Sequence, residues 1–165
     1  MYFVGIITDE KSRKYLNKIV NTQIRIDKFQ VIFITENNVE NMKNICFDTI
    51  VINKKIDWLG VLKNNLENTK IVINSDIYTD FKILRDFNVR VISYGFNSKA
   101  TVTISSNTEE CVQICIQRNI LTKKDKIEQQ EINIYKNENE DIYDIMILVI
   151  ILLIYNKNII SLLKL

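Results

Sequence analysis

The sequence of 165 residues contains no histidine and no proline, only three glycines, and a single alanine, Ala100. Without histidine the chain can form neither a Ser-His-Asp nor a Cys-His catalytic group, and no zinc or iron site that uses histidine. The glycines, Gly5, Gly60 and Gly95, lie too far apart for a GxGxxG or GxxxxGK[ST] phosphate loop. We therefore expect no catalytic residues, no metal site and no bound cofactor, with ATP and magnesium kept as the less favoured alternative, and the missing residues argue against an enzyme more than for one.

The overall composition is that of an ordinary globular protein. Hydrophobic residues make up 47% and charged residues 25% of the chain. With 22 Lys and Arg against 20 Asp and Glu, the net charge of +2 is too balanced to indicate a nucleic-acid-binding surface. The chain has 31 Ile, 20 Asn and 17 Lys, residues with A/T-rich codons, so we attribute this bias to the base composition of the source genome.

The three cysteines, Cys46, Cys111 and Cys115, are too few and odd in number for a disulfide scaffold. We interpret them as small buried hydrophobic side chains in a reducing cytosol, and a redox or metal-binding pair at Cys111 and Cys115 is the alternative. The first ten residues have no basic region and too short an apolar run for a signal peptide. Together these features predict a cytoplasmic location.

Over residues 1–96, short apolar runs alternate with amphipathic stretches. The runs predict strands at 2–7, 29–34, 47–52, 70–73 and 89–94, and the stretches predict helices at 10–22, 56–66 and 77–87. Asp9 is a candidate N-cap of the first helix. Strand and helix in alternation predict a three-layer α/β fold, Rossmann-like or P-loop-like, with a mostly parallel sheet flanked by helices.

Residues 97–136 predict a small antiparallel β extension, because the segments 100–105, 111–118 and 131–135 alternate apolar and polar side chains. Residues 137–165 predict C-terminal helices, the first over 141–155. No linker interrupts the chain, so we expect one domain over residues 1–165.

The uncharged run at 145–155 predicts a helix that is apolar around its whole circumference, and such a helix must be buried on every side. We expect that one chain of this size does not cover it, and we predict a homodimer through the 142–165 region. The run is shorter than the roughly 20 apolar residues that a spanning helix needs. Membrane insertion is therefore not expected, and anchoring by residues 145–165 is kept as an alternative.

Three segments resemble the central domain of the Mur ligases, the ATP-dependent enzymes that add amino acids to peptidoglycan precursors. They follow one another in the order of that family and cover residues 70–165 better than the first 70. The segments are Lys70-Ile-Val-Ile-Asn-Ser-Asp76, Val91-Ile-Ser-Tyr-Gly-Phe-Asn97 followed by Ala100–Ser106, and Asp141–Tyr155 with Asn158-Ile159. The chain is also similar to small stand-alone Mur-ligase-like proteins of low-GC bacteria, which share the Tyr-Gly-Phe-Asn-Ser-Lys-Ala stretch and a later Gln-Arg, here Gln117-Arg118.

The sequence departs from this family at its functional positions. Lys11-Ser12 stands near the place of the family's phosphate-loop Lys-Thr, but Asp9 and Glu10 replace its glycines, and two carboxylates would repel a triphosphate. The family's metal-binding histidine has no counterpart, and the family's two helix asparagines correspond to Asp141 and Asp144. We find neither the family's substrate domain nor its ligase domain within these residues, so we expect no catalysis by the family's mechanism from this chain alone.

The resemblance implies a degenerate, non-catalytic Mur-ligase-like binding or regulatory protein without a working ATP site. The alternative is an accessory protein of cell-wall ligation that retains weak nucleotide or UDP-sugar binding. The expected partner is another protein or a second copy of the chain, and nucleic acid is not expected. The candidate ligand-binding residues are Lys11, Ser12, Asn74, Asp76, Tyr94, Asn97 and Arg118.

Overall fold

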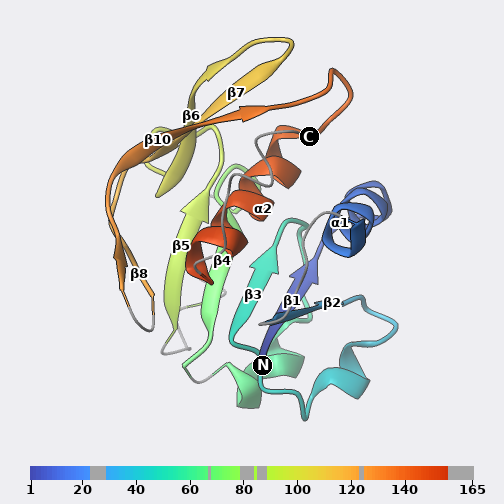
Figure 1. Cartoon of the computed structure of the whole chain (residues 1–165). Coiled ribbons are helices and arrows are strands. Elements are labelled where there is room, and N and C mark those ends of the chain that lie inside the picture. The colour runs from blue at the N-terminus through green and yellow to red at the C-terminus, as the bar shows by residue number, and fades with distance from the viewer. Residues whose placement is uncertain (23–28, 67, 79–83, 85–88, 123–124, 156–165) are drawn as a thin grey trace.

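The computed structural model describes residues 1–22, 29–66, 68–78, 84, 89–122 and 125–155. Within them, eight strands form one mixed sheet in the order β10-β7-β6-β5-β4-β3-β1-β2 (Figure 1). The pairs from β2 through β6 are parallel, and β6, β7 and β10 pair antiparallel. The parallel strands are β1 (Tyr2–Ile7), β2 (Phe29–Phe33), β3 (Thr49–Ile52), β4 (Lys70–Asn74) and β5 (Arg90–Tyr94). The chain is thus an α/β protein with a mostly parallel sheet, as the alternating pattern predicts.

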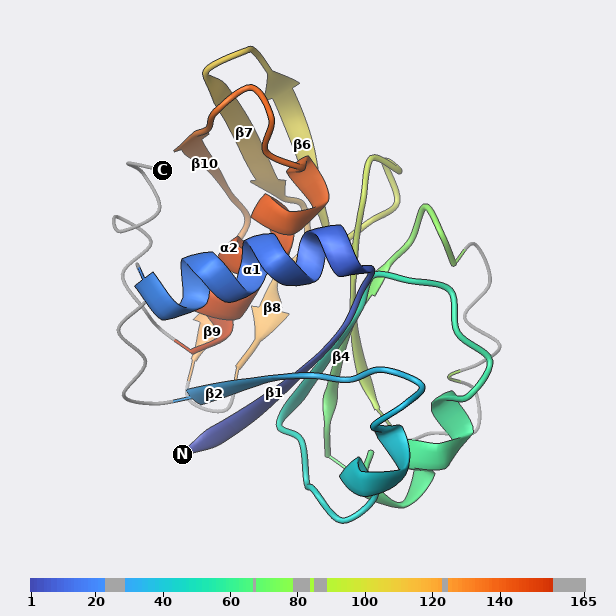
Figure 2. The ribbon, with the colours of Figure 1, turned by 90° about the vertical axis from the view of Figure 1, so that its right-hand side faces the viewer.

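The central strands are buried on both faces, which explains their unbroken apolar sequences. Every residue of β3 and β4 is buried. Side chains alternate along a strand, so Val51 and Val72 join one apolar cluster, whereas Ile50 and Ile71 join another on the opposite face. Helices α1 and α2 lie on the first face and two short 3-10 helices on the second (Figure 2).

Helix α1 (Glu10–Thr22) has the predicted bounds, and local chemistry explains its start. The Asp9 carboxylate accepts a hydrogen bond from the Ser12 N–H at 2.9 Å, which confirms the predicted N-cap. Leu16 is fully buried against the sheet, whereas Glu10 lies on the exposed face.

The opposite face of the sheet carries η1 (Val39–Met42) and η2 (Leu59–Asn65). The prediction of an α-helix at 56–66 is wrong in type, because this segment forms a 3-10 helix. Leu59 and Leu62 are both buried, and a spacing of three residues aligns side chains along one face of a 3-10 helix. The predicted helix at 77–87 lies for the most part outside the described residues.

The predicted antiparallel extension is confirmed in β6 (Val102–Asn107), β7 (Cys111–Ile116) and β10 (Gln130–Tyr135). Strand β6 begins beside the last residue of β5, where Val102 pairs with Tyr94, and continues beyond the end of β5. A separate hairpin of β8 (Ile120–Leu121) and β9 (Lys126–Ile127) follows β7. The sequence pattern does not predict this hairpin, because each of its strands has only two residues.

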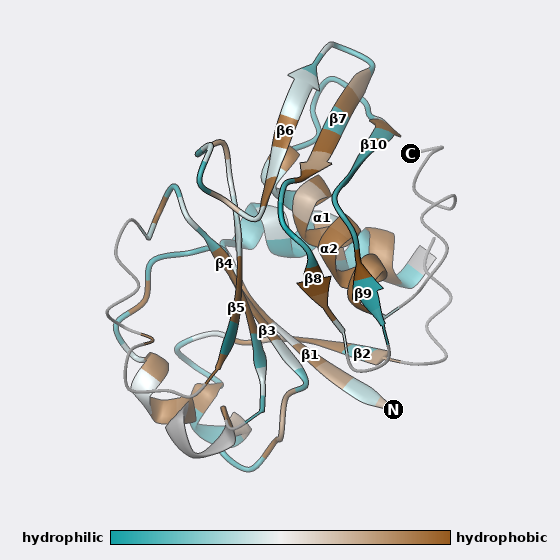
Figure 3. Cartoon of the chain, turned by 90° about the vertical axis from the view of Figure 1, so that its left-hand side faces the viewer, coloured by the Kyte–Doolittle hydropathy of each residue, from teal (hydrophilic) through white to brown (hydrophobic). Residues whose placement is uncertain are grey.

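Helix α2 (Ile142–Ile154) occupies the space between the parallel strands and the extension (Figure 3). Its residues 145–152 are at most 2% exposed, and they share one apolar cluster with β1, β7, β8, β10 and α1. A single chain therefore covers this helix, and the premise of the predicted dimer fails over Ile142–Tyr155. Residues 156–165, which complete the predicted interface, lie outside the described residues.

Two further predictions concern membranes and cysteines. In the described part of the chain, no helix has the length and apolar character needed to cross a membrane. Cys46 is exposed, so the expectation that all three cysteines are buried is wrong at this position; it lies in a loop before β3 rather than in an apolar run. Cys111 and Cys115 are free thiols, half-buried on β7.

Candidate functional site

The carboxyl ends of β3, β4 and β5 carry a buried cluster of polar side chains. The Asn53 amide oxygen accepts hydrogen bonds from the Tyr94 hydroxyl at 2.8 Å and the Asn74 amide at 2.9 Å. The Asn53 amide nitrogen in turn donates to the Thr8 hydroxyl at 3.3 Å, beyond the end of β1. Tyr94 and Asn74 are at most 1% exposed, so these groups hold neighbouring strands together rather than presenting themselves to a ligand.

The Asp76 carboxylate organises the turn that follows β5. It accepts hydrogen bonds from the backbone N–H groups of Phe96 at 2.6 Å and Asn97 at 3.1 Å, and from the Tyr143 hydroxyl at 3.0 Å. Gly95, at φ +149°, makes this approach feasible, because a Cβ there would lie 2.6 Å from the nearer carboxylate oxygen. Three donors thus satisfy Asp76, and its role in this arrangement is to fix the Gly95–Asn97 turn.

The connection from β1 to α1 consists of only two residues, Thr8 and Asp9. The Asp9 carboxylate occupies the helix N-terminus through its hydrogen bond to the Ser12 N–H. A phosphate group bound at a helix N-terminus would use the same kind of donor. Lys11 and Ser12 belong to the first turn of α1, and the Ser12 side chain is buried.

Asp144 in the first turn of α2 is the most unusual charged side chain in this region. It is 2% exposed, and its Oδ1 atom has no hydrogen-bond partner among the described residues. Burial raises the pKa of the Asp144 carboxyl to about 7, against the opposing effects of a hydrogen bond from Ser12 and the charge of Lys11. Asp141 and Asp9 add to the rise in pKa through charge repulsion.

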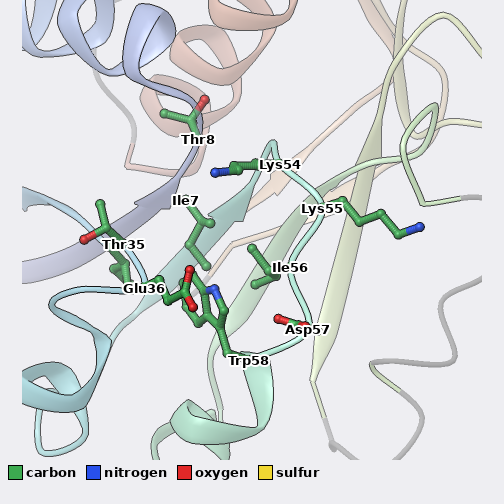
Figure 4. A pocket seen from close by; sticks show the side chains of 10 residues that line it. Ile7, Thr8, Thr35, Glu36, Lys54, Lys55, Ile56, Asp57 and Trp58 are labelled. Carbon is green, nitrogen blue, oxygen red and sulfur yellow. The ribbon is translucent and has the colours of Figure 1, made fainter.

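A pocket of about 400 Å³ opens at the carboxyl ends of β1, β2 and β3 (Figure 4). Figure 4 shows the Lys54 side chain and the Trp58 ring reaching toward the space below Thr8, whereas the Lys55 side chain extends away. The residues that line the pocket are Ile7, Thr8, Ile34, Thr35, Glu36, Lys54, Lys55, Ile56, Asp57 and Trp58. Its walls thus combine apolar side chains with two lysines and two carboxylates.

Tyr78 holds the segment that forms one wall of this pocket. Its hydroxyl accepts a hydrogen bond from the Ile56 N–H at 2.7 Å and donates to the Lys54 carbonyl at 3.2 Å. Burial is also the main reason why the pKa of the Tyr78 hydroxyl is raised, so this group stays a neutral hydrogen-bonding partner. The Tyr78 hydroxyl therefore fixes the position of the Lys54–Trp58 segment.

The structure places most of the predicted site residues at the carboxyl ends of the parallel strands, and gives most of them partners within the chain. Six of them lie at or just beyond those ends, and the Arg118 guanidinium donates to the Lys99 carbonyl at 2.7 Å. Those six are Lys11, Ser12, Asn74, Asp76, Tyr94 and Asn97. None of the seven predicted residues lines the pocket at β1–β3.

The sequence analysis missed the residues of this pocket, Lys54 and Trp58 among them. The available signal was the polar Asn-Lys-Lys that follows the third apolar run, but its meaning depends on which strands are neighbours. Among the described residues, no cluster of three or more Cys, Asp or Glu side chains is arranged to hold a metal ion. Neither a protein-family model nor a curated protein matches the chain.

Proposed function

We propose that the chain is a non-catalytic, Mur-ligase-like binding protein that holds a small zwitterionic or neutral polar molecule in the pocket at the ends of β1 and β3. The single observation that carries the proposal is the position of this pocket. Strand β1 lies between β2 and β3, so the chain leaves β1 to one side first and to the other side afterwards. In open α/β sheets, ligands bind outside the carboxyl ends of the strands at such a reversal.

The class of ligand follows from the charges of the lining. The pocket carries charges of both signs, with Lys54 on one side and Glu36 and Asp57 on the other. Such a lining suits a molecule with both a positive and a negative group, or a neutral one with several hydrogen-bonding groups, better than a polyanion. The partly buried indole of Trp58 offers an apolar wall for a planar part of the ligand.

The proposal excludes MgATP as the physiological ligand. The connection between β1 and α1 is two residues long, and Asp9 already engages the N-terminus of α1. A polyphosphate there would compete with a carboxylate and meet the nearby charge of Glu10. These features support the loss of a nucleotide site in a three-layer, Rossmann-like domain.

Support for the Mur-like part of the proposal comes from the segments that carry the resemblance. Asp76, at the end of the first segment, accepts hydrogen bonds from Phe96 and Asn97 in the second and from Tyr143 in the third. The three segments therefore form one hydrogen-bonded unit, as expected if they were inherited together.

Trp58 provides a direct test, because it is the single tryptophan of the chain and lines the pocket. Its fluorescence is measured while amino acids, nucleosides, UDP-sugars and MgATP are titrated in turn. We expect a saturable change with one zwitterionic or neutral class. Lys54→Ala should weaken that binding about tenfold, the usual effect of losing one charged contact, and Lys14→Ala on the exposed face of α1 is the matched control.

Two results would overturn this proposal. The first is micromolar binding of MgATP that Lys11→Ala abolishes, which would instead favour the alternative of a retained nucleotide or UDP-sugar site. The second is an unchanged affinity in Lys54→Ala for whichever molecule binds, because the pocket would then not be the site.

A further inference from the structure

One side of β5 is open over most of its length. Strand β5 pairs with β4 from Arg90 to Tyr94, but with β6 only at Tyr94 (Figure 1). Among the described residues, no other strand pairs with this side of β5. The open side therefore runs along Arg90–Ser93.

The direction of the backbone groups identifies which N–H and C=O groups of β5 point toward the open side. The Tyr94 carbonyl accepts a hydrogen bond from Ser75 on the β4 side, and the Gly95 N–H donates to Val102 on the β6 side. In a parallel strand the N–H and C=O of one residue point to the same side, and the side alternates along the chain. Counting back from Tyr94, the N–H and C=O of Val91 point toward the open side.

This edge forms a wall of a pocket of about 460 Å³. The opposite wall is the segment Arg118–Leu121, which leads from β7 into β8. A strand added to the edge of β5 would therefore lie beside a wall made by the same chain. Val91 and Leu121 are 39% and 58% exposed, so both walls also offer apolar surface.

The described lining of this pocket carries positive charge. Among the described residues that line it, Lys70, Arg90 and Arg118 are basic and none is acidic. In the part of the chain that the structure describes, neither Arg90 nor Arg118 forms an ion pair with a carboxylate. The Arg118 guanidinium is held by the Lys99 carbonyl through one nitrogen, and its remaining N–H groups stay available.

We propose that an extended acidic peptide segment of a partner protein adds a strand to the open edge of β5. Its backbone pairs with Val91, its carboxylates meet Arg90 and Arg118, and its apolar side chains contact Val91 and Leu121. Strand addition takes affinity from main-chain hydrogen bonds and specificity from the side chains that flank them. Guanidinium groups suit carboxylates because they can donate two parallel hydrogen bonds. This site does not depend on the pocket at β1–β3.

The test uses an array of short peptides in which Glu alternates with varied apolar residues, and a second array with Lys in place of Glu. We expect members of the Glu array alone to bind, and binding to weaken as salt is added. Arg90→Glu and Arg118→Glu should each lower the affinity about tenfold or more. Arg13→Glu, an exposed arginine on α1, is the matched control and should leave the affinity unchanged.

A second measurement separates strand addition from simple charge attraction. The tightest peptide is resynthesised with N-methyl groups on alternate backbone amides, in both registers, and one register should lose binding because its amides can no longer donate to β5. The proposal is overturned if both N-methylated forms bind like the parent, if inorganic phosphate or free glutamate competes as strongly as the peptide, or if no peptide of the Glu array binds. It is also overturned if the chain forms a dimer that Arg90→Glu disrupts, since a second copy would then occupy the edge.

Discussion

The buried carboxyl of Asp144 should make the stability of this protein fall as the pH rises from about 4 to 7. In the folded chain its pKa is about 7, whereas the ordinary value is 3.8. Between these values the folded state holds a proton that the unfolded state has lost, so the free energy of unfolding decreases with increasing pH. Each unit of pKa shift corresponds to about 1.4 kcal/mol, so the full decrease is about 4 kcal/mol.

The perturbation that tests this reasoning is Asp144→Asn, which keeps the shape of the side chain and removes its ionisation. We expect the variant to be about as stable as the wild type near pH 4 and more stable by up to about 4 kcal/mol at pH 8. The measurement is urea-induced unfolding at a series of pH values. Because the chain has no histidine, no imidazole titrates between pH 4 and 7 and contributes to the slope.

The control is Asp57→Asn, which changes the same chemistry at an exposed position and should leave the slope with pH as it is in the wild type. A wild-type stability that stays flat or increases between pH 4 and 7 would refute the reasoning. The same conclusion would follow if Asp144→Asn kept the slope of the wild type, since another group would then be responsible.

Three further substitutions test the packing around the sites. Gly95→Ala should lower the stability measured by thermal denaturation by about 1–3 kcal/mol, because the residue has φ +149° and its new Cβ would meet Asp76. Adding Asp76→Ala should recover the part of the loss that is due to the clash, and fully additive effects of the two substitutions would contradict this. Tyr78→Phe should lower the free energy of urea unfolding by about 1–3 kcal/mol, because the Ile56 N–H loses its partner. The substitution should also weaken ligand binding in the pocket at β1–β3, and an unaltered stability would show that this hydrogen bond is dispensable. Ile147→Ala should lower the free energy of unfolding by about 2–5 kcal/mol at every protein concentration, because the side chain is fully buried within one chain. A loss that depends on protein concentration, together with a dimeric mass by light scattering, would support the predicted dimer.

Local patterns were sufficient to predict most elements of this fold. The apolar run of β1 and the amphipathic stretch of α1 predicted the bounds of these elements, and Asp9 was recognisable as a cap because a cap bonds to residues only two or three positions away. The type of η2 was not predictable in this way. Its leucine spacing fits both an α-helix and a 3-10 helix, and packing against the sheet decides between them.

The candidate sites depended on long-range pairing. Lys54 and Thr8 come together only because β1 and β3 are neighbours, and the edge of β5 is open only because β6 begins beside Tyr94, the last residue of β5. Neither fact is encoded in the residues near those positions. The burial of α2 also depends on long-range contacts. Its apolar circumference predicted an interface between two chains, whereas in the structure the antiparallel extension covers the helix.

By itself, the sequence determined which chemical groups these 165 residues lack and which local elements they form. The missing histidine excludes catalytic groups that use an imidazole, and the spacing of the three glycines excludes a glycine-rich phosphate loop, which needs a backbone without Cβ. Only the tertiary structure decided which strands are neighbours, which helix is enclosed and how strongly Asp144 holds its proton. Those properties arise from contacts between residues far apart in the chain, and burial and pairing set their energies.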